Sequence, residues 1–240
     1  MCGVTKGLVG AVHCGGADLL SSRFAIRQIL TGPGRSRSPA YRQLLARLEI
    51  TPGKWRRVAR GDQACGWDVL HPGPQDGSGR AGDSAVVLRG QFHGTRVLLL
   101  SDLGRLGQRQ LLERETDLRA DILVAGLSGS DFLSQALLDA VKPRLLIVAG
   151  APFPAANRPN RQLRQRLARL RLPLVYTSDA GAAVLRFAAD GWHLKTMDGR
   201  QATADALGPY LPDPPPLDND VSADEIPGEP DGPEPVEPSP

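Results

Sequence analysis

The feature that most constrains the fold is a regular alternation of short apolar runs and amphipathic segments in the second half of the chain. Residues 121–125 and 144–149 are apolar on both faces, which is typical of buried parallel strands. Residues 106–115 and 131–141 instead place apolar side chains at helical spacing. Strand–helix units of this kind predict a sheet with helices packed outside it.

A hairpin is predicted ahead of these units. Residues 84–92 and 96–101 have strand composition and flank the turn sequence His93-Gly94-Thr95. Because residues 97–100 are apolar on both faces, this strand is predicted to be central. Hairpins followed by strand–helix units indicate an α/β fold with mixed sheets of the α+β kind. Further strands are predicted at 26–30, 55–60, 67–71, 174–177, 182–188 and 193–197, and further helices at 40–49, opened by Ser38 and Pro39, and at 160–171.

The charges divide the chain into two regions. Residues 211–240 contain nine acidic residues, ten prolines and no basic residue. The first 210 residues carry 29 basic and 17 acidic residues, a balance of +12. We therefore predict a folded domain over residues 1–200 and a proline-rich, acidic, disordered tail over residues 201–240. Two alternatives stay open for the tail: it lies loosely against the basic domain, or it is solvated and has no specific role.

Cysteine usage and hydropathy leave the compartment open. Cys2, Cys14 and Cys65 are too few and too scattered to predict a disulfide framework or a Cys-x-x-Cys zinc site, so we interpret them as free thiols. The apolar run at the N-terminus is interrupted by glycines, which makes it a poor signal peptide. No run approaches the roughly 20 apolar residues of a membrane span.

Two segments carry motifs of a known family. Residues 67–103 read WDVLHPGPQDGSGRAGDSAVVLRGQFHGTRVLLLSDL, in which a "vLhP" strand and a polar loop precede a hairpin and a "vLLtGD" strand. Residues 120–150 read ADILVAGLSGSDFLSQALLDAVKPRLLIVAG and align without a gap to a motif that begins "aDvLkvpHHGS". On these residues the chain resembles the carboxy-terminal, metallo-β-lactamase-like domain of ComEC-type competence proteins, which take up DNA in bacteria.

The resemblance places the family's metal motifs on residues that are mostly unable to bind a metal. Asp102 falls on a ligand aspartate, whereas Leu127 and Ser128 fall on the His-His pair and Arg158 falls on a later histidine. Leucine has no lone pair to donate, and arginine would place a positive charge beside the cation. The resemblance therefore implies that this part of the metal site is lost.

The amino-terminal motif is lost to a similar degree. The family's His-x-Asp-Ala-Asp-His-x-Gly-Gly places its other polar positions on Leu8, Gly10 and Val12, and only His13 survives. A catalytic zinc commonly needs about three protein ligands, so the vestigial His13 and Asp102 are too few. Apolar replacements avoid unpaired buried polar groups, each of which costs about 1–3 kcal/mol.

Other motif positions are retained, and they have simpler interpretations. Gly129-Ser130 keep the family's Gly-Ser, and Thr177 and Gly181 match its late Thr…Gly-Ala signature. Residues 126–130 lack the Lys-Ser/Thr ending of a phosphate-binding loop. We therefore interpret Ser130 as the N-cap of the next helix. Ser128 has no Gly-x-Ser-x-Gly frame that would favour a nucleophile.

The resemblance implies a degenerate, non-catalytic pseudoenzyme with a structural or DNA-contacting role, and no cofactor. The first alternative is an active metal-dependent phosphodiesterase or nuclease that binds zinc or manganese. Its ligands would come from His13, Cys14, His71, His93, Asp102 and His193. No His-x-x-x-His, His-x-His or Cys-x-x-Cys spacing supports that set.

The start of the chain leads to the second alternative. Family members begin this domain with strands ahead of the histidine motif, whereas Met1 lies almost on the aligned motif. The implied αββα sandwich is thus incomplete at its N-terminus, as in a fragment or a chain whose start lies further upstream. An exposed sheet edge favours association. The chain would then dock on a multi-span membrane competence protein, or on an N-terminal half encoded upstream, and be membrane-associated through that partner.

One basic segment supplies candidate nucleic-acid contacts. Residues 160–171 place three leucines on one face, so several arginines must point to solvent. Guanidinium groups pair well with phosphate. The candidates are Arg158, Arg161, Arg164, Arg166 and Arg169. The alternative is a solvated outer helix that binds nothing, and aromatic residues, at 5% of the chain, are too few for base stacking.

Overall fold

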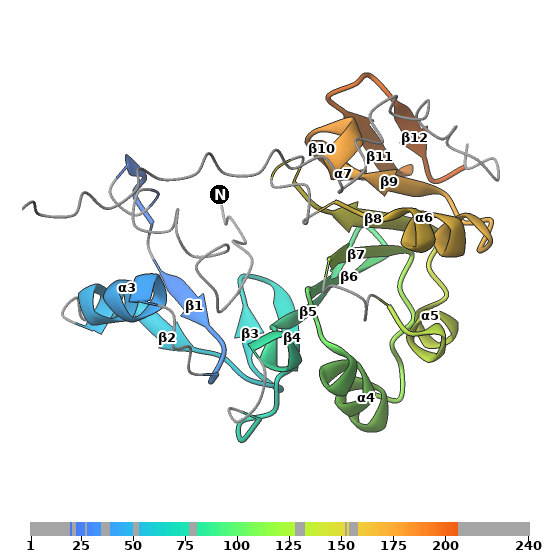
Figure 1. The fold of residues 1–240 in the computed structure, drawn as a ribbon. Helices are drawn as coiled ribbons and strands as arrows, with labels where there is room; N and C mark the ends of the chain where they lie inside the picture. Colours follow the sequence, from blue (N-terminus) through green and yellow to red (C-terminus); the bar gives the residue numbers. More distant parts are fainter. Residues whose placement is uncertain are drawn as a thin grey trace, which may run out of the picture.

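A seven-stranded mixed sheet forms the centre of the molecule (Figure 1). The computed structural model describes residues 20, 23–26, 28–34, 39–49, 53–76, 81–127, 133–151, 153 and 158–205. The strands, in spatial order, are β3 (Gln63–Ala64), β4 (Trp67–His71), β5 (Val87–Phe92), β6 (Thr95–Ser101), β7 (Ile122–Gly126), β8 (Leu145–Ala149) and β9 (Leu174–Tyr176). Neighbours from β3 to β6 are antiparallel, and those from β6 to β9 are parallel. The predictions of a mixed-sheet α/β fold and of a central strand over residues 97–100 are confirmed.

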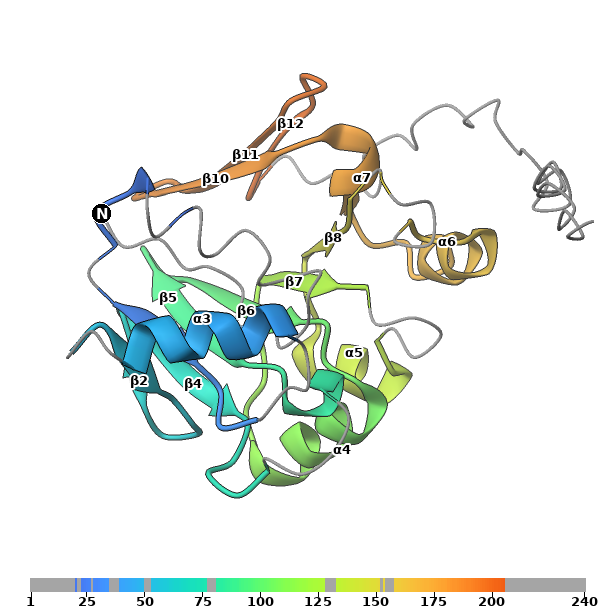
Figure 2. The same ribbon diagram turned by 60° about the vertical axis from the view of Figure 1, so that its left-hand side comes forward.

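Helices cover one face of this sheet. They are α4 (Arg105–Arg114), α5 (Gln135–Val141) and α6 (Arg161–Ala168), which lie together on that side in Figure 2. One apolar cluster joins Leu98, Leu123 and Leu146 of the sheet to Leu111, Leu137 and Leu167 of the three helices. Each fully buried leucine contributes about 1.5–3 kcal/mol relative to an exposed one. The amphipathic segments that alternate with apolar runs in the sequence thus form the helical layer, and the apolar runs form the parallel half of the sheet.

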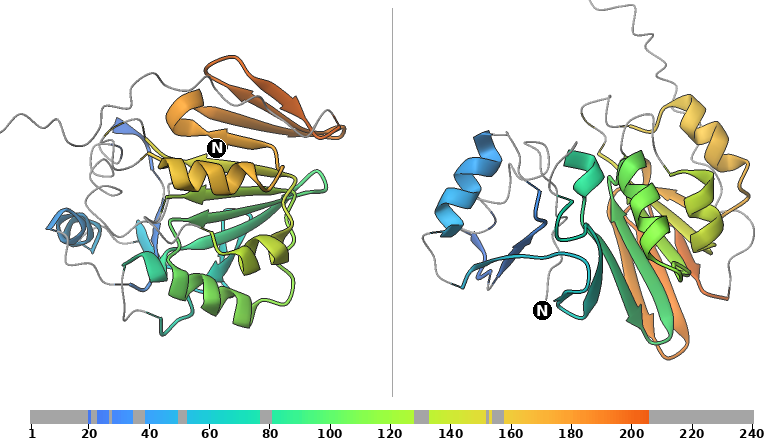
Figure 3. Two further views of the ribbon diagram at one scale, coloured as in Figure 1. Left: turned by 45° about the vertical axis from the view of Figure 1, so that its right-hand side comes forward. Right: turned by 90° about the horizontal axis from the view of Figure 1, so that it is seen from below.

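A second sheet covers the other face. It is antiparallel and consists of β10 (Ala183–Ala188), β11 (Gly191–Thr196) and β12 (Gln201–Thr203). Its Trp192, Leu194 and Ala202 pack against the strand residues Val97, Ile122, Leu145 and Val175. The rings of Trp67 and Phe92 are 5.0 Å apart, and those of Phe92 and Phe187 are 5.1 Å apart, so aromatic contacts also bridge the sheets. The layers are therefore helices, large sheet and small sheet (Figure 3).

A smaller unit precedes the large sheet. Strands β1 (Ile29–Thr31) and β2 (Trp55–Arg57) pair in parallel, and α3 (Pro39–Glu49) packs on them. The helix buries Tyr41, Leu44 and Leu48 against Ile29 and Trp55. Its predicted start at Pro39 is confirmed, whereas the strands are shorter than predicted, at three residues each. The Val58 N–H continues the pairing by donating to Thr31 O over 2.8 Å.

Three predictions about local features are wrong or incomplete. Helix α5 begins at Gln135, and its N-cap is Ser134, whose side chain accepts a hydrogen bond from Leu137 N; it is not Ser130. The backbone is held at Ser134 because its N–H donates to Gln108 Oε1 over 2.8 Å. Cys65 is disulfide-bonded, so it is not a free thiol. The short elements η1 (Ala81–Ser84), α7 (Thr177–Ala180), β3 and β12 were not predicted.

A buried polar network closes the end of β4. His71 is 0% exposed, and its Nε2 lies 2.8 Å from the Asp83 carbonyl oxygen. Its Nδ1 lies 3.9 Å from Asp76 Oδ2. The Asp76 carboxylate is held by both terminal nitrogens of Arg114. Burial lowers the pKa of His71, while the hydrogen bond from Arg114 lowers the pKa of Asp76.

The network predicts loss of stability in mild acid. An unfolded His71 takes up a proton near its ordinary pKa of 6.5, whereas the folded protein resists it. The free energy of unfolding should therefore fall as pH drops below about 6.5, by at most about 1.4 kcal/mol per pH unit, and should not change through this group at higher pH. Urea unfolding between pH 5 and 8 measures this effect. The His71→Asn variant should lose that slope and His93→Asn should keep it; an unchanged slope in His71→Asn would contradict the assignment.

Candidate functional site

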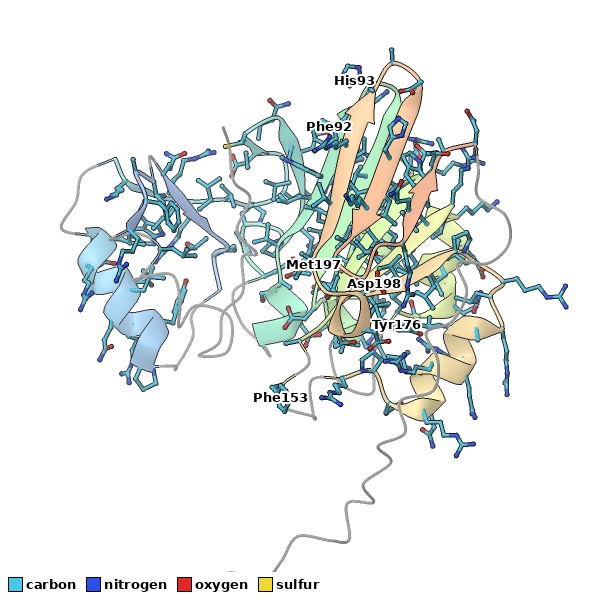
Figure 4. All side chains as sticks on the ribbon, turned by 90° about the horizontal axis from the view of Figure 1, so that it is seen from above. Phe92, His93, Phe153, Tyr176, Met197 and Asp198 are labelled. Atoms are coloured by element: carbon cyan, nitrogen blue, oxygen red, sulfur yellow. The ribbon has the colours of Figure 1, made fainter. Side chains whose placement is uncertain are left out.

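The candidate site lies where the four parallel strands β6 to β9 end. In open α/β sheets, ligands bind outside the carboxyl ends of the strands. Asp102 follows β6, Leu127 follows β7, Gly150 follows β8, and Thr177 follows β9. Figure 4 shows Tyr176, Met197 and Asp198 towards this end of the two sheets, and Phe92 and His93 at the opposite end.

The backbone just before Asp102 has a special conformation. Ser101 has a φ of 55°, in the left-handed region that favours glycine. A serine therefore occupies a backbone conformation that usually holds glycine. Ser101 is 8% exposed, and its Oγ has no hydrogen-bond partner. Such a conformation costs on the order of 1–3 kcal/mol and persists only where the surrounding structure enforces it. Gly126 contributes to that enforcement, because a Cβ there would lie 3.1 Å from the Ser101 carbonyl.

The retained threonine and glycine have structural roles. The Thr177 hydroxyl accepts a hydrogen bond from Gly150 N over 2.9 Å and donates one to Gly150 O over 2.8 Å. It therefore ties the ends of β8 and β9 together. Gly181 has a φ of 72°, and a Cβ there would lie 2.9 Å from Met197 Cβ. Both residues set the shape of this edge.

An ion pair that was not predicted joins α6 to α7. Arg164 Nη1 and Nη2 donate to the two carboxylate oxygens of Asp179 over 2.7 and 2.9 Å. The same guanidinium lies 4.3 Å from the centroid of the Tyr176 ring. Burial acts to raise the pKa of Asp179, but hydrogen bonds from Arg164 and Ser178 outweigh it, so the pKa is lowered. The Arg164 side chain is thus paired with a carboxylate of the same chain. The sequence did not predict this pair, because its partner lies 15 residues away.

The other candidate arginines differ in their surroundings. Arg158 lies 5.3 Å from the Phe153 ring centroid, and Arg166 Nη2 donates to Leu133 O over 2.8 Å. Arg161 and Arg169 are exposed. Neither forms an ion pair with an acidic residue in the described ranges. These two are therefore the side chains of the predicted set that are best placed to meet an external phosphate.

The described residues at the carboxyl edge do not supply the ligand set of a divalent metal. Asp102 supplies a carboxylate, but the Leu127 side chain packs against the helical-face core. Arg158 brings a positive charge and no lone pair. Among the residues that the structure describes, no three His, Cys, Asp or Glu side chains gather closely enough to hold a metal ion. Leu8, Gly10, Val12, His13 and Ser128 lie outside the described residues.

The alternative ligand set is dispersed as far as the structure describes it. His71 is buried against Asp83, and His193 pairs with Asp190 on β11. His93 lies in the turn before β6, so the length of that strand, roughly 20 Å, separates it from Asp102. These three histidines do not converge with Asp102. His13 and Cys14 are outside the described residues.

Comparisons with known proteins add no assignment. No family model matches the chain, and the curated proteins contain no match to it. Within the described ranges, no helix has the length and apolar character needed to cross a membrane.

The Arg164–Asp179 pair predicts a measurable coupling. Its carboxylate is 7% exposed, so Asp179→Asn should lower the free energy of unfolding by about 1.5–3 kcal/mol, the range for hydrogen bonds to charged groups. In a double-mutant cycle with Arg164→Gln, measured by urea unfolding, the double variant should cost much less than the sum of the single variants. Additive single effects would contradict a direct interaction.

Proposed function

We propose that the chain is a degenerate, non-catalytic metallo-β-lactamase-like domain related to ComEC-type DNA-uptake proteins, with a DNA-contacting role. The observation that carries the proposal is the end of β6, where Asp102 follows a serine held in a glycine-like conformation, φ 55°. The "vLLtGD" motif has a glycine at that position, and glycine is the residue that adopts this conformation most readily. The backbone conformation of Ser101 is therefore consistent with the proposed alignment.

The layer order supports an incomplete αββα sandwich. Helices pack on one face of the large sheet, and the small sheet packs on its other face. These are three of the four layers of an αββα sandwich. The second sheet has three strands, and its outward residues Arg186, His193 and Lys195 are polar. A complete sandwich would cover that face with helices; among the described residues, none of the helices α3 to α6 contributes to the core between the two sheets.

The replaced ligands support a non-catalytic role. An activated water needs a metal held by several donors, and two of the motif positions carry the hydrocarbon of Leu127 and the guanidinium of Arg158. The Leu127 side chain packs against the apolar core beneath the helices. The Arg158 guanidinium lies over the Phe153 ring. The edge is then a packed surface beside a basic helix.

The proposal predicts that the protein binds little metal and has no hydrolytic activity. Elemental analysis after dialysis should find far less than one zinc or manganese per chain. Neither metal, when added, should produce cleavage of duplex or single-stranded DNA. The Asp102→Ala variant should behave like the parent in both assays. Stoichiometric metal together with cleavage that Asp102→Ala abolishes would instead establish the metal-dependent nuclease.

DNA contact by α6 predicts a salt-dependent affinity. Fluorescence anisotropy with a 30-base-pair duplex should show binding that weakens steeply with salt. The double variant Arg161→Gln/Arg169→Gln should bind roughly tenfold more weakly at low salt, and its log–log salt slope should be smaller by about 2. Arg186→Gln/Lys195→Gln removes the same charge from the small sheet and serves as the control. Equal losses in both variants would mean that net charge, and not α6, attracts the DNA.

A further inference from the structure

The opposite edge of the large sheet carries a row of cations. Parallel strands start at one edge, about 4.8 Å apart, and a basic residue stands at the start of each strand from β6 to β9. Arg96 is the second residue of β6, Arg144 immediately precedes β8, and Arg119 and Arg171 stand three residues before β7 and β9. Lys142 and Arg169 extend the set. We call these six residues the amino-edge row.

Backbone hydrogen bonds hold the row together. Asp121 N donates to Arg96 O over 2.8 Å, and Arg144 N donates to Asp121 O over 2.8 Å. Leu146 N donates to Pro173 O over 2.9 Å, which brings the start of β9 beside that of β8. Residues spread over 75 positions of sequence therefore line one edge.

The charge of the row is uneven along its length. Its β6–β7 end includes two carboxylates, because Asp117 pairs with Arg96 and Asp121 Oδ2 accepts from the Arg96 backbone N–H. At the β8–β9 end, Lys142, Arg144, Arg169 and Arg171 are all exposed. None of these four forms an ion pair with a carboxylate of the described residues. These four cations are therefore open to solvent and accessible to an anion.

The acidic end of the chain begins at this place. Arg144 Nη2 donates to Ala204 O over 2.7 Å, and Ala204 N donates to Trp192 O over 3.1 Å. Residues 206–240 follow at once, with nine acidic residues and no basic one. The first of the nine, Asp213, is nine residues beyond Ala204, within about 30 Å of chain. The β8–β9 end of the row is well within that reach.

We propose that residues 206–240 bind the β8–β9 end of the amino-edge row as an intramolecular polyanion. A tethered segment has an effective concentration in the millimolar range, so weak ion pairs suffice. Eleven prolines in this segment oppose a helix or strand, so the contact is an extended, electrostatic one that salt screens. The segment then occupies a surface that phosphate groups of DNA would otherwise contact, which goes beyond the proposed function and regulates it.

Zero-length carbodiimide cross-linking of the full chain tests the proposal without DNA. Lys142 lies in the row, and Lys195 is an exposed lysine on β11, next to β12, that lies outside it. At about 20 mM salt, cross-links between Lys142 and the carboxylates of residues 206–240 should exceed those of Lys195 about fivefold. At about 0.5 M salt, where charges are screened within a few ångströms, the difference should vanish.

Two charge-matched variants complete the experiment. Arg169→Gln/Arg171→Gln should reduce the Lys142 cross-links to the level of Lys195, whereas Arg109→Gln/Arg161→Gln, which removes two charges outside the β8–β9 end, should leave more than half of them. Equal yields at Lys142 and Lys195 in the parent chain would overturn the proposal. Cross-links that join differently labelled copies would also overturn it, because a second copy would then be the occupant. Neither result depends on whether the protein binds DNA.

Discussion

The structure depends on strand β6, which is buried on both faces and bonded on both sides. It pairs antiparallel with β5 and parallel with β7, so it joins the hairpin half of the sheet to the strand–helix half. Leu98 is 0% exposed under the helices, and Val97 is 2% exposed under the small sheet. A polar residue at either position would lack a hydrogen-bond partner and would separate two layers at once. The carboxyl end of this strand positions Asp102, and its start positions Arg96.

The two edges of the sheet have different chemistry. At the carboxyl edge, two described side chains form contacts within the chain: Thr177 bonds Gly150, and Arg164 bonds Asp179. At the amino edge, cations stand side by side, and four of them form no ion pair with a carboxylate of the described residues. Since like charges repel, such a row persists only where solvent or an anion compensates it. The described side chains at the carboxyl edge thus pair within the chain, whereas four cations at the amino edge form no ion pair with a described carboxylate.

Several buried and partly buried polar groups join elements of the fold. His71 and Asp76 close the end of β4, and Gln108 joins α4 to the turn before α5 through Ser134 N and Leu103 O. The Asp83 carboxylate accepts hydrogen bonds from the Leu106 and Gly107 N–H groups. These N–H groups in the first turn of α4 have no partner within the helix, so Asp83 caps it from outside. Gly104, the N-cap of that helix, has no side chain to do so. The contacts of Asp83 with α4 and of Gln108 with Ser134 join segments more than 20 residues apart.

The sequence by itself determined the element types, the mixed-sheet class, the central place of β6 and the position of Asp102 at a strand end. These follow from local periodicity and short motifs, which depend on neighbouring residues. Only the tertiary structure decided that Arg164 is paired with Asp179, that α5 starts at Gln135, and that Arg119, Arg144 and Arg171 share one edge. The physical reason is that each of these facts requires a partner many residues away, and periodicity carries no record of which partner a side chain meets.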